Sequence, residues 1–389
     1  MFERKHERDM YIFLFVLAVG TACAFQGWRT LLNNFAVDVA SVDGLQMGIV
    51  QSIREIPGFL SLLVVYVLLI LKEHRLAALS VVILGIGVSA TGMFPSFVGI
   101  AFTTLLMSFG FHYFETLNQS LTLQYFGLRD APIVMGRLRS VGAMTNIFIG
   151  GIIWFAATYL SYEVLFFFVG AVAVGAGVWG LFRDPSSEEI ATQRKELVMK
   201  KKYWLFYALV FLAGARRQVF VAFAVFLLVD KFQYSVQAIT LLFVVNNVIN
   251  YFANPLIGKA VNRFGERKVL SLEYLALVGV FITYALTESA LVAGCLYVID
   301  NLFFNFAIAT KTFYQKIAEK EDMASGMAVG FTITHIAAVV IPALGGLAWL
   351  SNYRIVFFGA AFLSLVSLLL TQFIDRQLSM KNEATCEKN

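Results

Sequence analysis

Twelve apolar stretches, each close to the length of a membrane-crossing helix, constrain this chain more than any other feature. They lie near 10–36, 45–71, 76–94, 97–127, 133–159, 162–182, 203–230, 236–259, 269–287, 290–318, 324–349 and 354–375. A helix needs ~20 residues to cross a bilayer. In agreement, 59% of the 389 residues are hydrophobic and only 14% are charged. The sequence therefore predicts an all-α integral membrane protein with twelve transmembrane helices.

Basic residues gather in alternate connections between these stretches, and the opposite connections carry only Lys231 and Arg354. The basic connections are 1–9, 72–75, 128–132, 183–202, 259–268, 316–322 and 376–389. Cytoplasmic loops hold the excess of Lys and Arg in membrane proteins. We therefore expect both termini in the cytoplasm of a protein of the cell (inner) membrane, with the first stretch retained as an anchor.

Several classes of protein are disfavoured by the sequence. The net charge of +5 comes from the basic loops, which does not indicate a nucleic-acid partner. The three cysteines are far apart and form no metal or disulfide pattern. No phosphate-binding loop of the G-x-x-x-x-G-K-[ST] kind occurs, so we do not expect ATP to drive the protein. We expect no cofactor and no metal, with a small-molecule substrate and the lipid bilayer as partners of a monomer.

The chain repeats weakly, with offsets between 191 and 195 residues. The matching pairs are Val37-Asp38 with Val229-Asp230, Gly150-Gly151 with Gly345-Gly346, and Tyr162 with Tyr353. The sequence therefore predicts two six-helix pseudo-repeats. The expected domains are an N-terminal half at 1–182, a cytoplasmic linker at 183–202, a C-terminal half at 203–375 and a cytoplasmic tail at 376–389.

A basic turn that contains glycine joins the eighth and ninth stretches. It resembles the loop signature of the major facilitator superfamily through Gly258, Arg263, Gly265, Arg267 and Lys268. Asn262 stands where that family usually has an acidic residue, so a hydrogen bond is expected in place of a charged contact. The resemblance implies a secondary transporter that works by alternating access, with a substrate cavity at mid-membrane between the repeats. It also implies a gating contact that Arg263 and Arg267 make near Asp130.

Ionisable residues deep in the stretches are the candidate functional residues, because a charge at the middle of a membrane helix costs roughly 2.5–3.5 kcal/mol. The candidates for substrate binding are Gln26, Arg29, Arg54, Arg216, Arg217, Asn246, Asn250 and Asn305. The candidates for proton coupling are Glu115 first, then His112, Asp300, His335 and Glu55. Arg54 and Glu55 are adjacent and diverge by about 100° on a helix, so we expect them to serve different partners.

The excess of deep cations favours a small anionic or zwitterionic polar solute, and proton coupling is a further expectation. Arg217, with Arg216 beside it, is the leading candidate to meet the negative group. In a purely structural alternative, both arginines neutralise Glu55, Glu115 or Asp300. Other functional alternatives are a proton-driven exporter of amphipathic compounds, a transporter-fold sensor, and a membrane enzyme that uses His112 and Glu115.

Overall fold

The computed structural model describes residues 5–42, 44–187, 190–191, 193, 196, 199–234 and 236–379. Contacts group the chain into two compact units. Unit 1 comprises Met1–Phe126, Leu138–Val198 and Glu321–Thr332, and unit 2 comprises Gly127–Arg137, Met199–Lys320 and Ile333–Asn389. Unit 1 thus includes the segment 321–332 from the C-terminal part of the sequence, and unit 2 includes the segment 127–137 from the N-terminal part.

The described residues form helices and connections, without strands. Unit 1 holds α1 (Lys5–Asp38), α2 (Gly44–Phe59), the 3₁₀ turn η1 (Leu60–Leu63), α3 (Val64–Val67), α4 (Glu73–Thr91), α5 (Phe97–Tyr125) and α7 (Tyr162–Leu181). Unit 2 holds η2 (Lys201–Tyr203), α8 (Trp204–Gln218), the π-helix η3 (Val219–Ala224), α9 (Val225–Asp230), α10 (Val236–Phe264), α11 (Glu266–Leu286), α12 (Ala290–Phe304), α13 (Ala307–Ile317) and α15 (Tyr353–Thr371). The bounds of α6 (Ala131–Ala156), the turn η4 (Lys320–Asp322) and α14 (Met323–Ser351) cross from one unit to the other.

The membrane fold expected from hydropathy is confirmed. Within the described residues, 11 helical segments are long and apolar enough to cross a membrane. The remaining expected stretch, 324–349, coincides with α14, which is a helix of 29 residues.

Three of the expected stretches are interrupted rather than continuous. The stretch 45–71 changes from α2 to η1 a few residues after Pro57, whose ring removes one backbone donor and crowds the preceding turn. The stretch 203–230 contains the π-helix η3 in its second half, and the stretch 290–318 breaks at Asn305 and Phe306 between α12 and α13. Such irregular backbone is tolerated at membrane depth where it lies against protein or a cavity.

The connection expected at 259–268 is a single-residue turn. Helix α10 continues to Phe264, α11 begins at Glu266, and Gly265 between them has a φ of +78°. Only glycine adopts that backbone conformation without strain. The basic side chains of the motif therefore lie on helix ends rather than in an extended loop.

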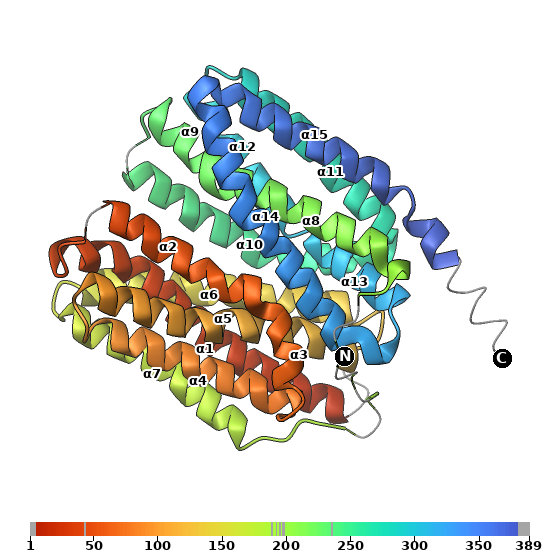
Figure 1. Cartoon of the computed structure of the whole chain (residues 1–389), viewed down its shortest axis with the longest axis horizontal. Coiled ribbons are helices and arrows are strands. Elements are labelled where there is room, and N and C mark those ends of the chain that lie inside the picture. Colours follow the sequence, from red (N-terminus) through yellow and green to blue (C-terminus); the bar gives the residue numbers. More distant parts are fainter. Residues whose placement is uncertain are drawn as a thin grey trace. The chain divides into compact units, whose positions relative to one another are not determined.

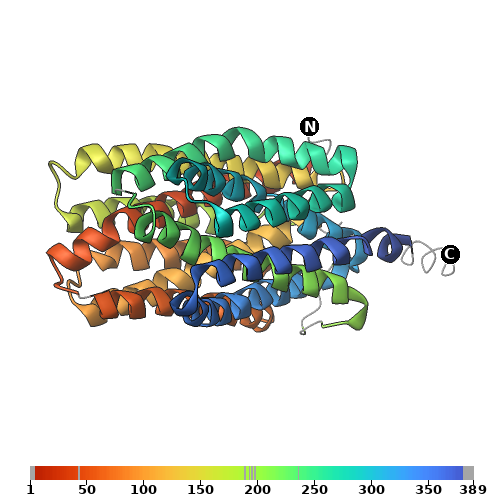
Figure 2. The same ribbon diagram turned by 90° about the horizontal axis from the view of Figure 1, so that it is seen from above.

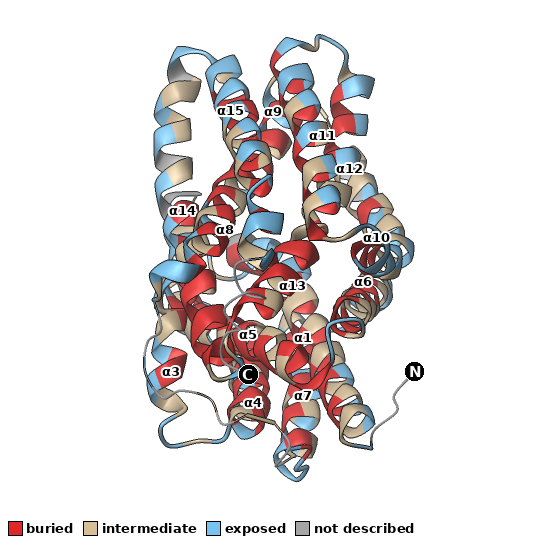
Figure 3. Cartoon of the chain, turned by 90° about the vertical axis from the view of Figure 1, so that its right-hand side faces the viewer, coloured by how far each residue is buried: buried red, intermediate tan, exposed pale blue. Residues whose placement is uncertain are grey.

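Close helix contacts hold unit 1 together. Figure 1 shows α1, α4, α5 and α7 side by side, and α4 packs against both α5 and α7. A Cβ atom added at Gly110 would lie 2.3 Å from the carbonyl oxygen of Ser80, and one at Gly170 would lie 2.5 Å from that of Gly85. Small residues let membrane helices approach at such distances. Buried residues therefore predominate along α4 and α5 (Figure 3).

In unit 2, α15 packs lengthwise against α11 and α8 (Figures 1 and 2). The helix starts repeat between the units, as the sequence offset predicts. Ser96 caps α5 by accepting a bond from the amide of Gly99, and Ser289 caps α12 through Val292 in the same way. Ser161 and Asn352 cap α7 and α15 likewise. Each cap satisfies one of the free backbone amides at a helix start. The matched helices α5 and α12, and likewise α7 and α15, therefore begin with the same kind of side-chain hydrogen bond.

Candidate functional site

Arg216 is enclosed within unit 2, where its side chain is 4% exposed. Its guanidinium donates to Oγ of Ser367 on α15, and Nη2 lies 3.8 Å from Oε1 of Glu273 on α11. The guanidinium carbon also lies 4.4 Å from the ring centroid of Tyr274. Arg216 therefore pairs with Glu273, which is none of the three carboxylates named in the structural alternative. Glu273 was not a sequence candidate, although its position inside an apolar stretch was a usable signal.

Arg217, the next residue, is exposed on the surface of unit 2. Its guanidinium carbon lies 5.2 Å from the ring centroid of Phe304, at the end of α12. Adjacent side chains on a helix point about 100° apart, so one arginine faces the interior of the unit while the other faces outward. The two arginines therefore have different surroundings and are expected to have different roles.

Three amide side chains meet beside the break between α12 and α13. Oδ1 of Asn250 accepts hydrogen bonds from Nδ2 of Asn301 at 3.1 Å and from Nδ2 of Asn305 at 2.8 Å. Asn246 and Asn250, two of the sequence candidates, lie on α10 together with Asn254. The structure shows Asn250 bridging to α12, while Asn246 and Asn254 are buried.

The ion pair between Arg54 and Glu55 corrects the expectation that they serve different partners. Nη2 of Arg54 lies 2.6 Å from Oε1 of Glu55, and Nε donates to the same oxygen at 3.1 Å. The arginine side chain is long enough to reach across the 100° that separates neighbouring positions. The backbone carbonyl of Arg54 accepts a bond from Oγ of Ser108, and Nε2 of His112 lies 3.3 Å from the same carbonyl. This contact joins α2 to α5.

The other candidates of unit 1 lie on α5 and α1. His112 is buried, and its ring packs edge-on to Phe331 with centroids 5.8 Å apart. Glu115, one turn further along α5, is half-buried. On α1, Gln26 donates to Oγ1 of Thr30 at 3.2 Å and Arg29 is exposed.

Two further candidates for proton coupling are buried in unit 2. Asp300 on α12 and His335 on α14 are each 4% exposed.

The gating motif makes its contacts within unit 2. Nδ2 of Asn262 donates to the backbone carbonyl of Arg129, next to Asp130, so the residue that replaces the usual acidic group does form a hydrogen bond. Nη1 of Arg267 lies 3.0 Å from Oδ2 of Asp375 rather than beside Asp130. The reason is that Arg267 follows the Gly265 turn and lies on the first turn of α11.

Helices α6 and α10 approach each other closely at the same motif. A Cβ atom added at Gly258 would lie 2.3 Å from the carbonyl oxygen of Pro132, and one at Gly136 would lie 2.4 Å from that of Asn254. The guanidinium carbon of Arg263 lies 5.2 Å from the ring centroid of Phe264, and no contact of Arg263 with α6 is found among the described residues. Gly258 therefore serves helix packing, which the sequence motif alone did not specify.

Paired side chains join the helix ends at the opposite end of unit 2. Nζ of Lys231 lies 2.8 Å from Oε2 of Glu288 and 2.6 Å from the hydroxyl oxygen of Tyr353. Burial lowers the pKa of Lys231, but its bonds to Glu288 and Tyr353 outweigh that effect and leave the pKa raised. In unit 1 the equivalent tyrosine, Tyr162, instead donates to Asp38 at 3.1 Å. In both units a tyrosine at the start of the last helix therefore contacts a charged residue at the end of the first expected stretch of that half. The charged residue is acidic in unit 1 and basic in unit 2.

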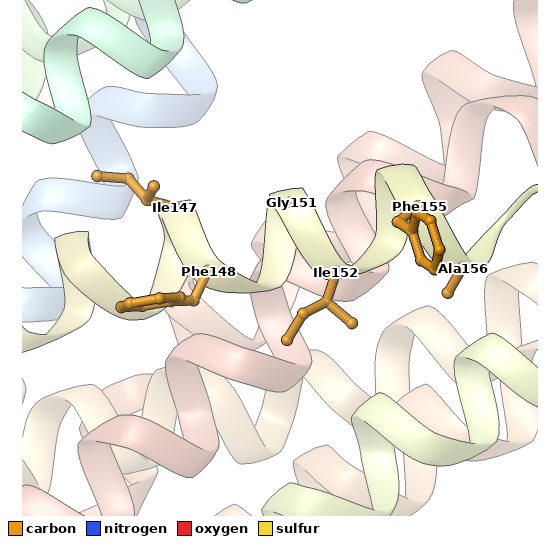
Figure 4. A pocket seen from close by; sticks show the side chains of 6 residues that line it. All are labelled: Ile147, Phe148, Gly151, Ile152, Phe155 and Ala156. Carbon is orange, nitrogen blue, oxygen red and sulfur yellow. The ribbon is translucent and has the colours of Figure 1, made fainter.

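An apolar hollow lies along α6 in unit 1. It is lined by Ile147, Phe148, Gly151, Ile152, Phe155 and Ala156 (Figure 4). No charged or amide side chain is among these residues, so the hollow offers nothing that would recognise a polar solute. The polar candidates described above are therefore the better site.

Comparison with known proteins identifies the family of the chain. The family model of the Major Facilitator Superfamily matches residues 10–342. No curated protein sequence matches the chain.

Solved structures share the fold. The human organic anion transporter MFSD10 superposes with a TM-score of 0.78 at 12% identity, covering 94% of this chain and 99% of that one. FucP in an outward conformation gives a TM-score of 0.76 at 12% identity, covering 95% and 99%. A bacterial homologue of the iron transporter ferroportin gives 0.74 at 15% identity, covering 94% and 99%. Since the family model covers most of the sequence and these folds agree over nearly all of it, the chain belongs to the major facilitator superfamily.

Proposed function

We propose that this secondary transporter moves a small anionic or zwitterionic polar solute by alternating access, coupled to the movement of protons. The observation that carries the proposal is the exposed guanidinium of Arg217, held over Phe304 beside the break between α12 and α13. Asn250, Asn301 and Asn305 supply amide groups at that break. A charge and several amides beside irregular backbone are what recognition of a polar anion requires.

Arginine suits this task for a physical reason. Its planar guanidinium donates two parallel hydrogen bonds to a carboxylate or phosphate and stays charged in a water-poor site. Phe304 restricts the guanidinium from one side, so less rotational freedom is lost when the solute binds. In unit 1, Gln26, Arg29 and Arg54 remain proposed substrate residues. MFSD10 is described as an organic anion transporter, which agrees with this class of solute.

The test compares two conservative substitutions in adjacent positions. We expect Arg217→Lys to weaken solute affinity by about 10- to 100-fold, because lysine cannot form the forked contact. The purified protein is first screened with small organic acids and phosphorylated metabolites, using the rise in unfolding temperature that a bound ligand causes by mass action. The affinity of the variant for the best ligand is then measured by the same shift.

Arg216→Lys is the matched control. Because Arg216 pairs with Glu273 and Ser367, we expect this change to lower the unfolding temperature of the unliganded protein while leaving solute affinity nearly unchanged. Unaltered affinity in Arg217→Lys, or a native solute that is a cation, would overturn the proposal.

A further inference from the structure

The orientation of the Asn250 side chain follows from its hydrogen bonds, atom by atom. Its Oδ1 accepts from Nδ2 of Asn301 at 3.1 Å and from Nδ2 of Asn305 at 2.8 Å. The same Nδ2 of Asn305 also donates to the backbone carbonyl of Asn301 at 3.1 Å. Because a backbone carbonyl only accepts hydrogen bonds, the atom of Asn305 that faces it must be the nitrogen. The atom of Asn250 that this nitrogen reaches must then be the oxygen, so the direction of the Asn250 amide is fixed.

The amide nitrogen of Asn250 therefore points away from α12. Its Nδ2 makes no hydrogen bond within the described residues and is not enclosed by the protein, in keeping with a half-buried side chain. An amide nitrogen carries two N–H donors. Unit 2 thus holds two donors in a fixed direction that it does not use itself.

Asn250 lies on the side of α10 that faces away from lipid. Successive residues of a helix are turned by about 100°, so Asn250 points roughly 160° away from both Val248 and Phe252. Exposed apolar side chains mark that opposite side along the helix: Leu241, Val244, Val248, Phe252 and Leu256. Such a stripe suits contact with lipid, where an unpaired polar group would cost several kcal/mol. The donors of Asn250 are therefore directed away from the bilayer.

The last turn of α12 connects this amide with Arg217. Asn301 and Asn305 lie one turn apart, and Phe304 lies between them in the same turn. The guanidinium carbon of Arg217 lies 5.2 Å from the ring centroid of Phe304. Arg217 on α8 and Asn250 on α10 thus contact the same turn of α12. A solute whose negative group is bound by Arg217 can extend along this turn to the amide of Asn250.

We propose that Asn250 is a specificity-determining residue that donates a hydrogen bond to an oxygen of the solute beyond its anionic group, and that Asn301 and Asn305 are positioning residues. The class of solute that fits is an organic acid with a further keto, hydroxyl or phosphate oxygen. An acid without that oxygen would leave the donors unpaired, and an ammonium group would bring another donor against them. The proposal rests on the proposed function and deepens it, because it favours oxygen-bearing anions over amino acids.

The alternative is a network that only packs α10 against α12. Amide side chains commonly join membrane helices in this way. Packing requires the three amides to bond one another, but it places no demand on the group that Nδ2 of Asn250 faces. The two alternatives therefore differ in whether Asn250 changes which solutes are preferred.

The test uses sets of acids that share a carbon skeleton and differ in one group. The sets are propionate, pyruvate and alanine, and glutarate, 2-oxoglutarate and glutamate. Their affinities for the purified wild type are measured through the rise in unfolding temperature. We expect the keto acid of at least one set to bind about 10-fold more tightly than the other two members, since a keto oxygen only accepts. Asn250→Asp keeps an oxygen toward Asn301 and Asn305 but removes the donors, so this preference should be lost.

Variants of Asn305 separate an effect on orientation from an effect on stability alone. Asn305→Ala frees the Asn250 amide, so we expect the preference for the keto acid to fall by about 3-fold or more. In a protein that already carries Asn250→Ala, adding Asn305→Ala should leave the preference unchanged, because the residue it orients is gone. Asn247→Ala is the control on the same helix and should retain the wild-type preference, because Nδ2 of Asn247 donates to the backbone carbonyl of Phe243 at 2.9 Å.

Equal affinities within both sets, a wild type that prefers the amino acid, or an intact preference in Asn250→Asp would each overturn the proposal. A further change when Asn305→Ala is added to Asn250→Ala would overturn the positioning role. Should Asn250→Asp fail to fold, Asn250→Ala takes its place, and failure of both would mean that the network serves packing only. Arg217→Lys keeps this outcome separate from the proposed function. If it weakens the binding of all acids while Asn250→Asp keeps the preference, the anion proposal stands and only the role of Asn250 is wrong.

Discussion

At the scale of single residues, neighbours in the sequence have different surroundings because adjacent side chains on a helix point in different directions. Arg216 points into unit 2 and balances Glu273, while Arg217 is exposed over Phe304. Charge content predicted that these arginines matter. It did not predict the partner of Arg216, because Glu273 is 57 positions away in sequence and the two come together only because α8 and α11 both pack against α15.

The same scale gives a prediction outside the spans, at Glu319. Its carboxylate accepts hydrogen bonds from Lys200 and Lys202, which lower its pKa to about 2. A carboxyl with a depressed pKa stabilises the folded state above its unfolded pKa, near 4.5, and loses that contribution as the pH falls through about 2. The three side chains are partly exposed, so we expect Glu319→Gln to lower the free energy of unfolding by only about 0.2–1 kcal/mol at pH 7.

Unfolding temperatures of the wild type and Glu319→Gln, measured at pH 7 and again at pH 3, check this expectation. The difference between the two proteins should shrink at the lower pH. Glu321→Gln is a nearby control, since no ion pair of Glu321 is found in the described part of the chain. A difference that grows with acidification would contradict the assignment.

At the scale of elements, hydropathy predicted where helices occur, and it missed where they are interrupted. The breaks after Pro57, at η3 and at Asn305 arise within apolar stretches, where each side chain still suits a membrane helix. They depend on local competition between backbone geometry and tertiary contacts, such as the bond from the amide of Leu62 to Oγ1 of Thr332. A hydropathy average contains no information on such contacts.

The α6–α10 crossing gives a prediction for an element. Gly258→Ala places a methyl group against the carbonyl of Pro132, so we expect overpacking to lower the free energy of unfolding by about 1–3 kcal/mol. Gly279→Ala on α11 is the control, because nothing lies within 4 Å of the added methyl group there. That control should be neutral or gain up to about 1 kcal/mol from better helix propensity. Unfolding temperatures of the two variants measure the contrast, and equal effects would show that the crossing is not tight.

At the scale of the whole molecule, the distribution of basic residues over the loops predicts the orientation of the chain. We expect positions at the Gly265 turn to lie in the cytoplasm and positions near Lys231 and Glu288 to lie outside. The test uses two variants of a protein from which Cys23, Cys295 and Cys386 have been removed, one with Lys268→Cys and one with Glu288→Cys. Each variant is treated in intact cells with a thiol reagent that cannot cross the membrane. Only the cysteine at 288 should be labelled, and labelling at 268 alone would reverse the topology.

Helices α6 and α14 are each divided between the two units, and this division affects the order in which the protein can assemble during synthesis. Unit 1 is completed by residues up to Thr332, and it contains the rest of α6 from Leu138 onward. The ribosome reaches the end of that unit about 200 residues after it has finished the first part of α6. At 5–20 residues per second, the nascent chain waits roughly 10–40 s before its N-terminal helices have all their partners. Membrane insertion and final packing are therefore separate events in time, and a chain cut after the 183–202 linker should remain incomplete until its other half is supplied.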